Sequence, residues 1–242
     1  MNHFITRGLL ASTLLFAANA AQAQITIGAR VGANLANARI TTNSSFVVDT
    51  DTKAKVGAQA GLTLNAQFGK LAVQPSVLFS QKGFQLTQAG TATLNGVTTT
   101  FLNKSDAALN YLEVPVNLVY TFGDEQGFQI FAGPYVGVGL SGKDKRDGRS
   151  IVTMQSGAVT DYSTSETYDV RFGDGRKENS IYYRTINVGL NGGIGYRVGA
   201  LQAQVGYVYG LSNMLPSYYG DTVTGKDRTV QLSLVYFFGT HK

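Results

Sequence analysis

The 242-residue sequence contains no cysteine, which excludes disulfides, thiolate metal sites and a lipidated cysteine at a processed N-terminus. It has only two histidines, His3 and His241, close to its two ends. Because histidine is the usual general base near neutral pH, we expect no catalytic residues and no enzymatic activity. The formal net charge is only +5 and no concentrated basic stripe occurs, so we expect no nucleic-acid partner. We also expect no metal and no cofactor.

Long apolar runs are missing after the first residues of the chain. Residues 1–23 contain Arg7, the apolar run "GLLASTLLFAA" and an A-x-A cleavage site at Ala21–Ala23. These features predict a secretory signal peptide, with the mature chain beginning at Gln24. No later segment is long and apolar enough for a membrane helix. We therefore expect one exported domain over residues 24–242.

What the sequence does have is alternation of apolar with small or polar residues. The pattern recurs in eight segments: 25–37, 55–69, 71–83, two within 110–140, 181–198, 201–212 and 227–239. A period of two predicts β-strands with two unlike faces. The second face is rich in glycine and nearly uncharged, unlike the water-facing side of a soluble barrel such as a lipocalin. We therefore expect the apolar face to contact lipid and the small face to line a narrow lumen.

The connections between these segments alternate in length. Short turns occur at Gly69-Lys70, at 123–127 and at Gly199-Ala200, whereas polar loops are expected at about 38–54, 84–107, 142–180 and 213–226. This alternation is typical of outer-membrane barrels. The sequence therefore predicts an all-β fold, an eight-stranded antiparallel up-and-down transmembrane β-barrel with periplasmic termini. We expect local bulges at Pro75, Pro115 and Pro134, because proline removes a ladder hydrogen bond.

Four motifs carry a family resemblance: "GARVGANLAN" (28–37), "VQPSVLFSQKG" (73–83), "LNYLEVPVN" (109–117) and "AGPYVG" (132–137). Together they resemble the PorT-like outer-membrane β-barrel domain family. Ser76 stands where the second motif usually has glutamate, so a carboxylate is missing there. The resemblance implies the fold and an outer-membrane location. It does not imply one activity, because similar barrels serve different purposes, and a role as an accessory component of a protein secretion or assembly machine is one alternative.

Three groups of residues are candidate sites. Glu113 is taken as the lone acid in a strand interior, and counting from the short turns places Lys82 at a similar depth, with Arg30 as the second choice of partner. We expect this lumen charge pair to be structural. Arg184 and Tyr182 fall at the loop end of segment 181–198, where they would lie at the membrane interface.

The third group lies in the predicted loop 142–180. Lys143, Lys145, Arg146 and Arg149 make this loop locally basic. They form either a surface for lipopolysaccharide phosphates or a protein partner, or a solvated loop without a partner. We expect a monomer with a packed lumen that acts as a structural or binding protein through such loops. The alternatives are the secretion component, a small channel or a lipid-modifying enzyme.

Overall fold

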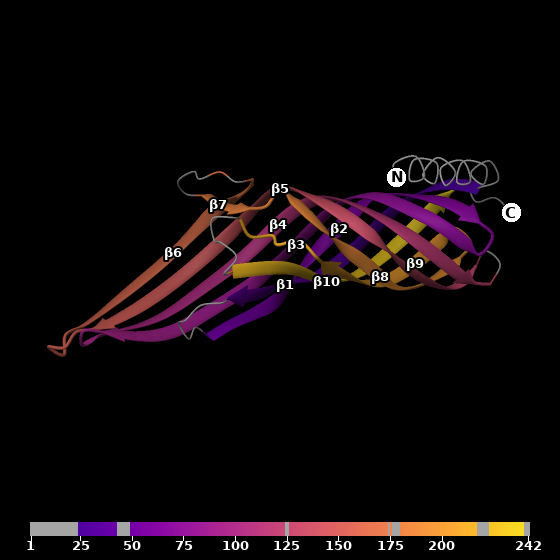
Figure 1. The fold of residues 1–242 in the computed structure, drawn as a ribbon. Helices are drawn as coiled ribbons and strands as arrows, with labels where there is room; N and C mark the ends of the chain where they lie inside the picture. Colours follow the sequence, from indigo (N-terminus) through magenta and orange to yellow (C-terminus); the bar gives the residue numbers. More distant parts are fainter. Residues whose placement is uncertain are drawn as a thin grey trace, which may run out of the picture.

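The computed structural model describes residues 24–42, 49–123, 126–173, 175, 180–216 and 223–239 (Figure 1). These residues form one ten-stranded sheet. The strands are β1 (Gln24–Thr42), β2 (Asp49–Phe68), β3 (Leu71–Leu94), β4 (Val97–Phe122), β5 (Gly127–Thr153), β6 (Val159–Phe172), β7 (Ser180–Tyr183), β8 (Ile186–Val198), β9 (Leu201–Gly210) and β10 (Val223–Phe238). The predicted signal peptide, residues 1–23, lies outside the described residues.

Eight of the ten strands close into a ring. Neighbours pair in the order β4-β3-β2-β1-β10-β9-β8-β5, and the additional pairing of β4 with β5 completes the circle. Every contact around this ring is antiparallel. The predicted all-β barrel is therefore confirmed. β6 and β7 lie outside the ring and extend the sheet from β5. The sequence did not predict β6, whereas β7 covers the start of the predicted strand 181–198.

The two faces of the strands point as the alternation predicted. In β1, Ile27 and Val31 are exposed at the outer surface, whereas Arg30 and Asn34 are buried. The same holds in β4, where Leu112 and Leu118 point outward and Asn117 is buried inside. The ring thus carries an apolar belt on its outside and polar side chains within. Among the described residues, no helix is long and apolar enough to cross a membrane.

The lumen is filled by side chains. Gln74 and Gln202, on opposite parts of the ring, exchange hydrogen bonds of 3.1 and 3.2 Å between their amide groups. Thr63 and Ser76 share a hydrogen bond of 2.8 Å between their hydroxyl groups. An eight-stranded barrel is just narrow enough for its own side chains to fill it in this way.

Glycine allows close approach of neighbouring strands at several points of the ring. At Gly133, a Cβ atom would lie 1.9 Å from the carbonyl oxygen of Val116. The two-residue turns use glycine for a different reason, because Gly69 and Gly199 have φ values of 58° and 56°. These turns lie at the same end of the ring as the described termini, where Ile27 pairs with Phe238.

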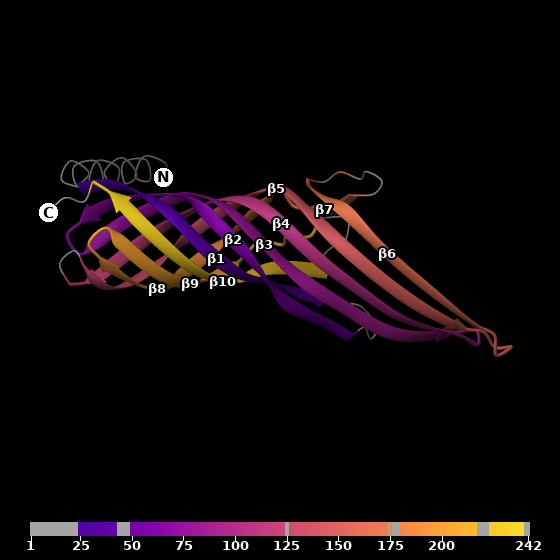
Figure 2. The same cartoon turned by 180° about the vertical axis from the view of Figure 1, so that it is seen from behind.

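At the opposite end of the ring, β3, β4 and β5 continue far beyond the other ring strands, and β6 lies alongside β5 (Figure 1; Figure 2 shows them from behind). The sequence predicted polar loops at 84–107 and 142–180, and both predictions are wrong. Instead β3 and β4 continue to a tight turn at Asn95-Gly96, and β5 pairs with β6 as a second hairpin. We call residues 83–94, 97–108, 142–153 and 159–172 the β3–β6 wall.

The strand irregularities also differ from expectation. Pairing keeps a constant register past Pro75, Pro115 and Pro134, so these prolines do not form register-shifting bulges. The shifts lie instead between Ala54 and Gln59, and between Asn110 and Tyr111. The predicted strand 181–198 is divided, because β7 runs parallel to β6 while β8 begins at Ile186 and joins the ring.

Candidate functional sites in the lumen and in the wall

A charged cluster lies in the lumen toward the end that carries the β3–β6 wall. There β3, β4 and β10 bring three ionisable side chains together. Lys82 Nζ is 2.5 Å from Glu113 Oε1 and 2.7 Å from Asp227 Oδ2. The three side chains are 4% exposed or less. One buried cation therefore lies between two buried carboxylates.

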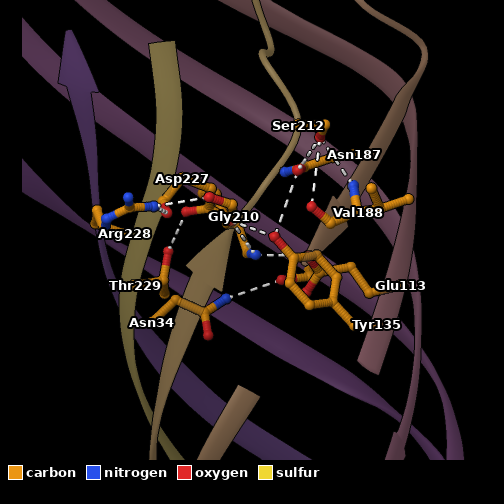
Figure 3. Close-up of polar contacts among 12 residues, drawn as sticks. Asn34, Glu113, Tyr135, Asn187, Val188, Gly210, Ser212, Asp227, Arg228 and Thr229 are labelled. Atoms are coloured by element: carbon orange, nitrogen blue, oxygen red, sulfur yellow. Dashed lines mark hydrogen bonds and ion pairs between the residues drawn. The ribbon is translucent and has the colours of Figure 1, made fainter. Parts of the chain in front are cut away.

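The two carboxylates are held differently, and Figure 3 shows part of their surroundings. Asp227 accepts hydrogen bonds from Lys82 at 2.7 Å and from the Thr229 hydroxyl at 2.6 Å, and the Tyr135 hydroxyl lies 3.5 Å away. Glu113 Oε1 contacts Lys82 as an ion pair without a well-formed hydrogen bond. Asp227 is therefore the more firmly anchored acid.

Sequence reasoning named two members of this cluster and missed the third. The structure brings Lys82 and Glu113 into contact, whereas Arg30 donates from Nη2 to the Ser233 hydroxyl at 2.9 Å and interacts with Glu113 only electrostatically, without a direct ion pair. Glu113 is not the lone acid of the strand interiors, because Asp227 lies within β10. Its position, two residues before Thr229 on the lumen face, was a signal that could have identified it.

Aromatic and apolar side chains close the lumen above these charges. Tyr111, Leu109 and Phe84 are almost completely buried there, within a larger apolar cluster. The cavity beside Lys82 and Asp227 measures only about 10 Å³. That is about the minimum space for one water molecule. The described side chains therefore leave no wide passage at this level.

A much larger cavity lies on the inner face of the β3–β6 wall. Its volume is about 490 Å³. Its apolar lining comes from Ile40, Phe84, Leu86, Tyr168, Tyr183, Leu215 and Val223, and its polar lining includes Gln88, Asn103, Lys104, Ser105, Arg146, Asp147 and Thr164. The cavity thus has an apolar floor and a polar wall.

Arg146 is a cation of this cavity that is held by a buried acid. Its Nε donates to Asp144 Oδ2 at 3.1 Å, and the fully buried Asp144 also accepts from the Ser105 hydroxyl at 2.6 Å. The guanidinium carbon lies 5.9 Å from the ring centre of Tyr168. The Arg146 side chain is nevertheless 45% exposed. A buried acid therefore fixes a cation that solvent can still reach.

The other predicted basic residues, Lys143, Lys145 and Arg149, do not line this cavity. Arg149 instead forms a two-pronged contact with Asp161 on β6, with a shortest distance of 2.6 Å. Hydrogen bonds from Arg149 hold the pKa of Asp161 below its ordinary value. The predicted basic group is therefore divided between two faces of the wall.

Tyr182 and Arg184 are not part of the outer face of a ring strand. Tyr182 lies on β7, half-buried, with its ring against Gly175. Arg184 follows β7, and its backbone N–H donates to the carbonyl of Met214 at 2.9 Å. A membrane-interface role for either residue stays a prediction. His3 and His241 lie outside the described residues.

An eight-stranded ring with an apolar outer belt and a polar, filled interior defines an integral outer-membrane β-barrel protein. The chain belongs to the family described as "outer membrane protein beta-barrel domain", whose model matches residues 18–215. No curated protein matches it.

Several solved structures are similar to this chain at low identity. The attachment invasion locus protein Ail of Yersinia pestis, solved with the heparin analogue sucrose octasulfate, is 14% identical with a TM-score of 0.39, covering 89% of this chain and 99% of Ail. Neisserial surface protein A is 13% identical with a TM-score of 0.37, covering 88% and 98% of the two chains. A deletion mutant of TodX, a monoaromatic hydrocarbon channel, is 8% identical with a TM-score of 0.27, covering 89% and 91%.

Proposed function

We propose that this outer-membrane protein is a monomeric, non-conducting barrel that acts as a binding protein through its β3–β6 wall. The observation that carries the proposal is the contrast between the two parts of the molecule. The ring is closed by buried side chains around Lys82, whereas the wall encloses a cavity of about 490 Å³. A cavity of this size lies within the range of about 300–1,000 Å³ usual for ligand sites.

The orientation in the membrane is part of the proposal. Outer-membrane barrels have short periplasmic turns and longer extracellular segments. We therefore place the turns at Gly69 and Gly199, and both chain ends, in the periplasm. The wall then faces the cell exterior, after export directed by residues 1–23. We propose no enzymatic activity, because the only histidines lie at the two ends of the sequence.

Planar-bilayer recording of the purified full-length protein tests the closed lumen. The wild type should give no unitary current steps, because Tyr111 and the charged cluster fill the passage. A Tyr111→Ala variant that still folds serves as a comparison for a partly opened lumen. Clean unitary steps from the wild type would refute the non-conducting part of the proposal.

A second candidate function is the PorT-like one, an accessory component of a secretion or assembly machine. It is favoured by an open sheet edge. In the described part of the chain, β6 pairs with β5 along one side and with β7 only over Asp169–Phe172, so residues 159–168 present an unpaired edge. Such an edge can accept a strand from a protein partner.

Pull-down from crosslinked outer membranes tests this second candidate. A stoichiometric envelope protein should copurify, and Ser163→Lys with Thr167→Lys should reduce its recovery, because edge lysines oppose strand addition. The matched control is Thr91→Lys with Thr93→Lys, which places the same charges on β3. If no stoichiometric protein copurifies, the secretion role is wrong.

A further inference from the structure

We propose that the wall cavity binds one single-chain anionic amphiphile, with its acyl chain on the apolar floor and its carboxylate or phosphate beside Arg146. This inference rests on the proposed binding function of the β3–β6 wall and names the ligand class. The cavity, the charge distribution and the burial of its floor each contribute to the argument.

The floor of the cavity suits an acyl chain. Phe84 and Tyr183 are buried in the apolar cluster at the base of the wall, and Leu86, Tyr168 and Leu215 pack against them. All five also line the cavity. A volume of about 490 Å³ equals about sixteen water molecules at roughly 30 Å³ each. An apolar chain of comparable volume would replace water that contacts mainly apolar side chains, and this replacement is favourable.

The charges at the cavity favour an anionic head group. Arg146 lines the cavity, and its acidic partner Asp144 lies fully buried behind it. Asp147, the acid of the lining, accepts from the Ser165 hydroxyl at 2.6 Å and lies 3.6 Å from Lys145. Lys104 supplies a second cation in the lining. Asp147 is thus already engaged. Arg146 is paired with Asp144 through Nε, but its side chain is still 45% exposed, so a head group can reach it as well as Lys104.

The arrangement also favours a single chain with a compact head over a large polar ligand. The uncharged polar side chains of the lining are few, namely Gln88, Asn103, Ser105 and Thr164. Arginine recognises carboxylates and phosphates through paired hydrogen bonds. An uncharged ligand with the same chain should therefore bind more weakly than the acid.

Photocrosslinking in nanodiscs tests this inference with the full-length barrel. The first probe is diazirine-labelled palmitate, compared with its uncharged methyl ester, and labelled peptides are mapped by mass spectrometry. The acid should label residues 84–86, Tyr168 or Leu215 more strongly than the lipid-facing belt. Arg146→Gln should lower this labelling about tenfold, the effect of losing one charge-assisted hydrogen bond. Arg149→Gln on the same hairpin is the matched control and should leave it unchanged.

A second probe, a diazirine-labelled lysophosphatidic acid placed in the nanodisc bilayer, identifies the source of the ligand. Labelling of the cavity by palmitate alone supports a free fatty acid, and labelling by the lipid probe alone supports a membrane lipid. Leu86→Trp, which fills the cavity, should abolish either signal while retaining heat-modifiable migration on gels. If the cavity is labelled no more than the outer belt, or equally in the Arg146→Gln variant, the inference is wrong. The closed-lumen recording is unaffected by that result, so failure of the ligand class is distinguishable from failure of the non-conducting part of the proposed function.

Discussion

Removing Lys82 should destabilise the barrel more than removing either of its acidic partners. Lys82 lies 2.5 Å from Glu113 and 2.7 Å from Asp227, and all three side chains are 4% exposed or less. Lys82→Met would leave two buried carboxylates without their shared cation. Breaking a buried ion pair in this way typically costs about 3–5 kcal/mol. We expect a loss of this size in the free energy of unfolding.

The acids should behave unequally and should couple to Lys82. Glu113→Gln leaves the well-formed Lys82–Asp227 hydrogen bond in place, so we expect a loss below about 2 kcal/mol. In the Lys82→Met background, the same change removes one of two repelling carboxylates. There it should stabilise the protein by about 1 kcal/mol, which gives a coupling energy within the usual range of about 0.5–3 kcal/mol for residues in contact. The sign of the Glu113→Gln effect should therefore reverse.

Urea unfolding of the refolded barrel in lipid vesicles, followed by heat-modifiable gel migration, measures these free energies. The matched control is Lys55→Met, since Lys55 forms an ion pair with Asp106 that is about one-third exposed. The control should lose less than about 1 kcal/mol because solvent screens the pair. Additive effects of Lys82→Met and Glu113→Gln would refute the reasoning and would mean that the two side chains act independently.

Other properties of the barrel can be tested alongside this one. In urea unfolding, Gly133→Ala should lower the free energy of unfolding by about 1–3 kcal/mol, because the added Cβ would lie 1.9 Å from a backbone oxygen. Gly137→Ala should be neutral, because the nearest atoms to its added Cβ lie 3.6 Å away. Equal effects of the two changes would contradict the close packing. Arg149→Gln should return the depressed pKa of Asp161 toward its ordinary value of 3.8, as measured by NMR titration, and an unchanged pKa would mean that Arg149 is not the cause. Unheated protein should migrate differently from boiled protein on SDS gels, because a closed ring has no edge from which to unravel; identical migration would argue against closure. Intact-mass measurement of outer-membrane material should give a chain beginning at Gln24, and a retained N-terminus would refute the predicted cleavage.

Within the ring, the faces of the strands could be predicted from sequence because lipid and lumen impose opposite demands. Leu112 must contact hydrocarbon while Glu113 cannot, so neighbouring residues differ sharply. Beyond the membrane this contrast is weaker, since neither face of the wall has to contact hydrocarbon, and apolar residues such as Phe84 and Leu86 line its cavity together with polar ones. Segments such as 91–106 therefore show little alternation, although they form strands. The sequence alone consequently predicts loops where the wall lies.

The sites show the same limit. The approximate depth of Lys82 and Glu113 followed from counting residues along neighbouring strands. Asp227, which lies 145 positions from Lys82 in the sequence, depends on how the ring closes. The cavity beside Arg146 could not be predicted at all, because its lining combines residues of the β3–β6 wall with distant residues such as Ile40, Leu215 and Val223.

The unequal strand lengths limit where the bilayer can surround the barrel. They also make one side of the protein rise farther above the bilayer than the other. β9 has 10 residues, whereas β4 and β5 have 26 and 27. Ten residues at about 3.3 Å each and a tilt near 40° span roughly 25 Å, close to the apolar height of such barrels. Little of β9 is therefore left to rise above the lipid. On the β3–β6 side the long strands rise far above the bilayer surface, whereas β9 ends close to it. A molecule diffusing in the outer leaflet would therefore meet a tall barrier on the β3–β6 side and a short one near β9. We expect ligands to enter the cavity from the β9 side. The two sides of the barrel are therefore not equivalent for the surrounding lipid.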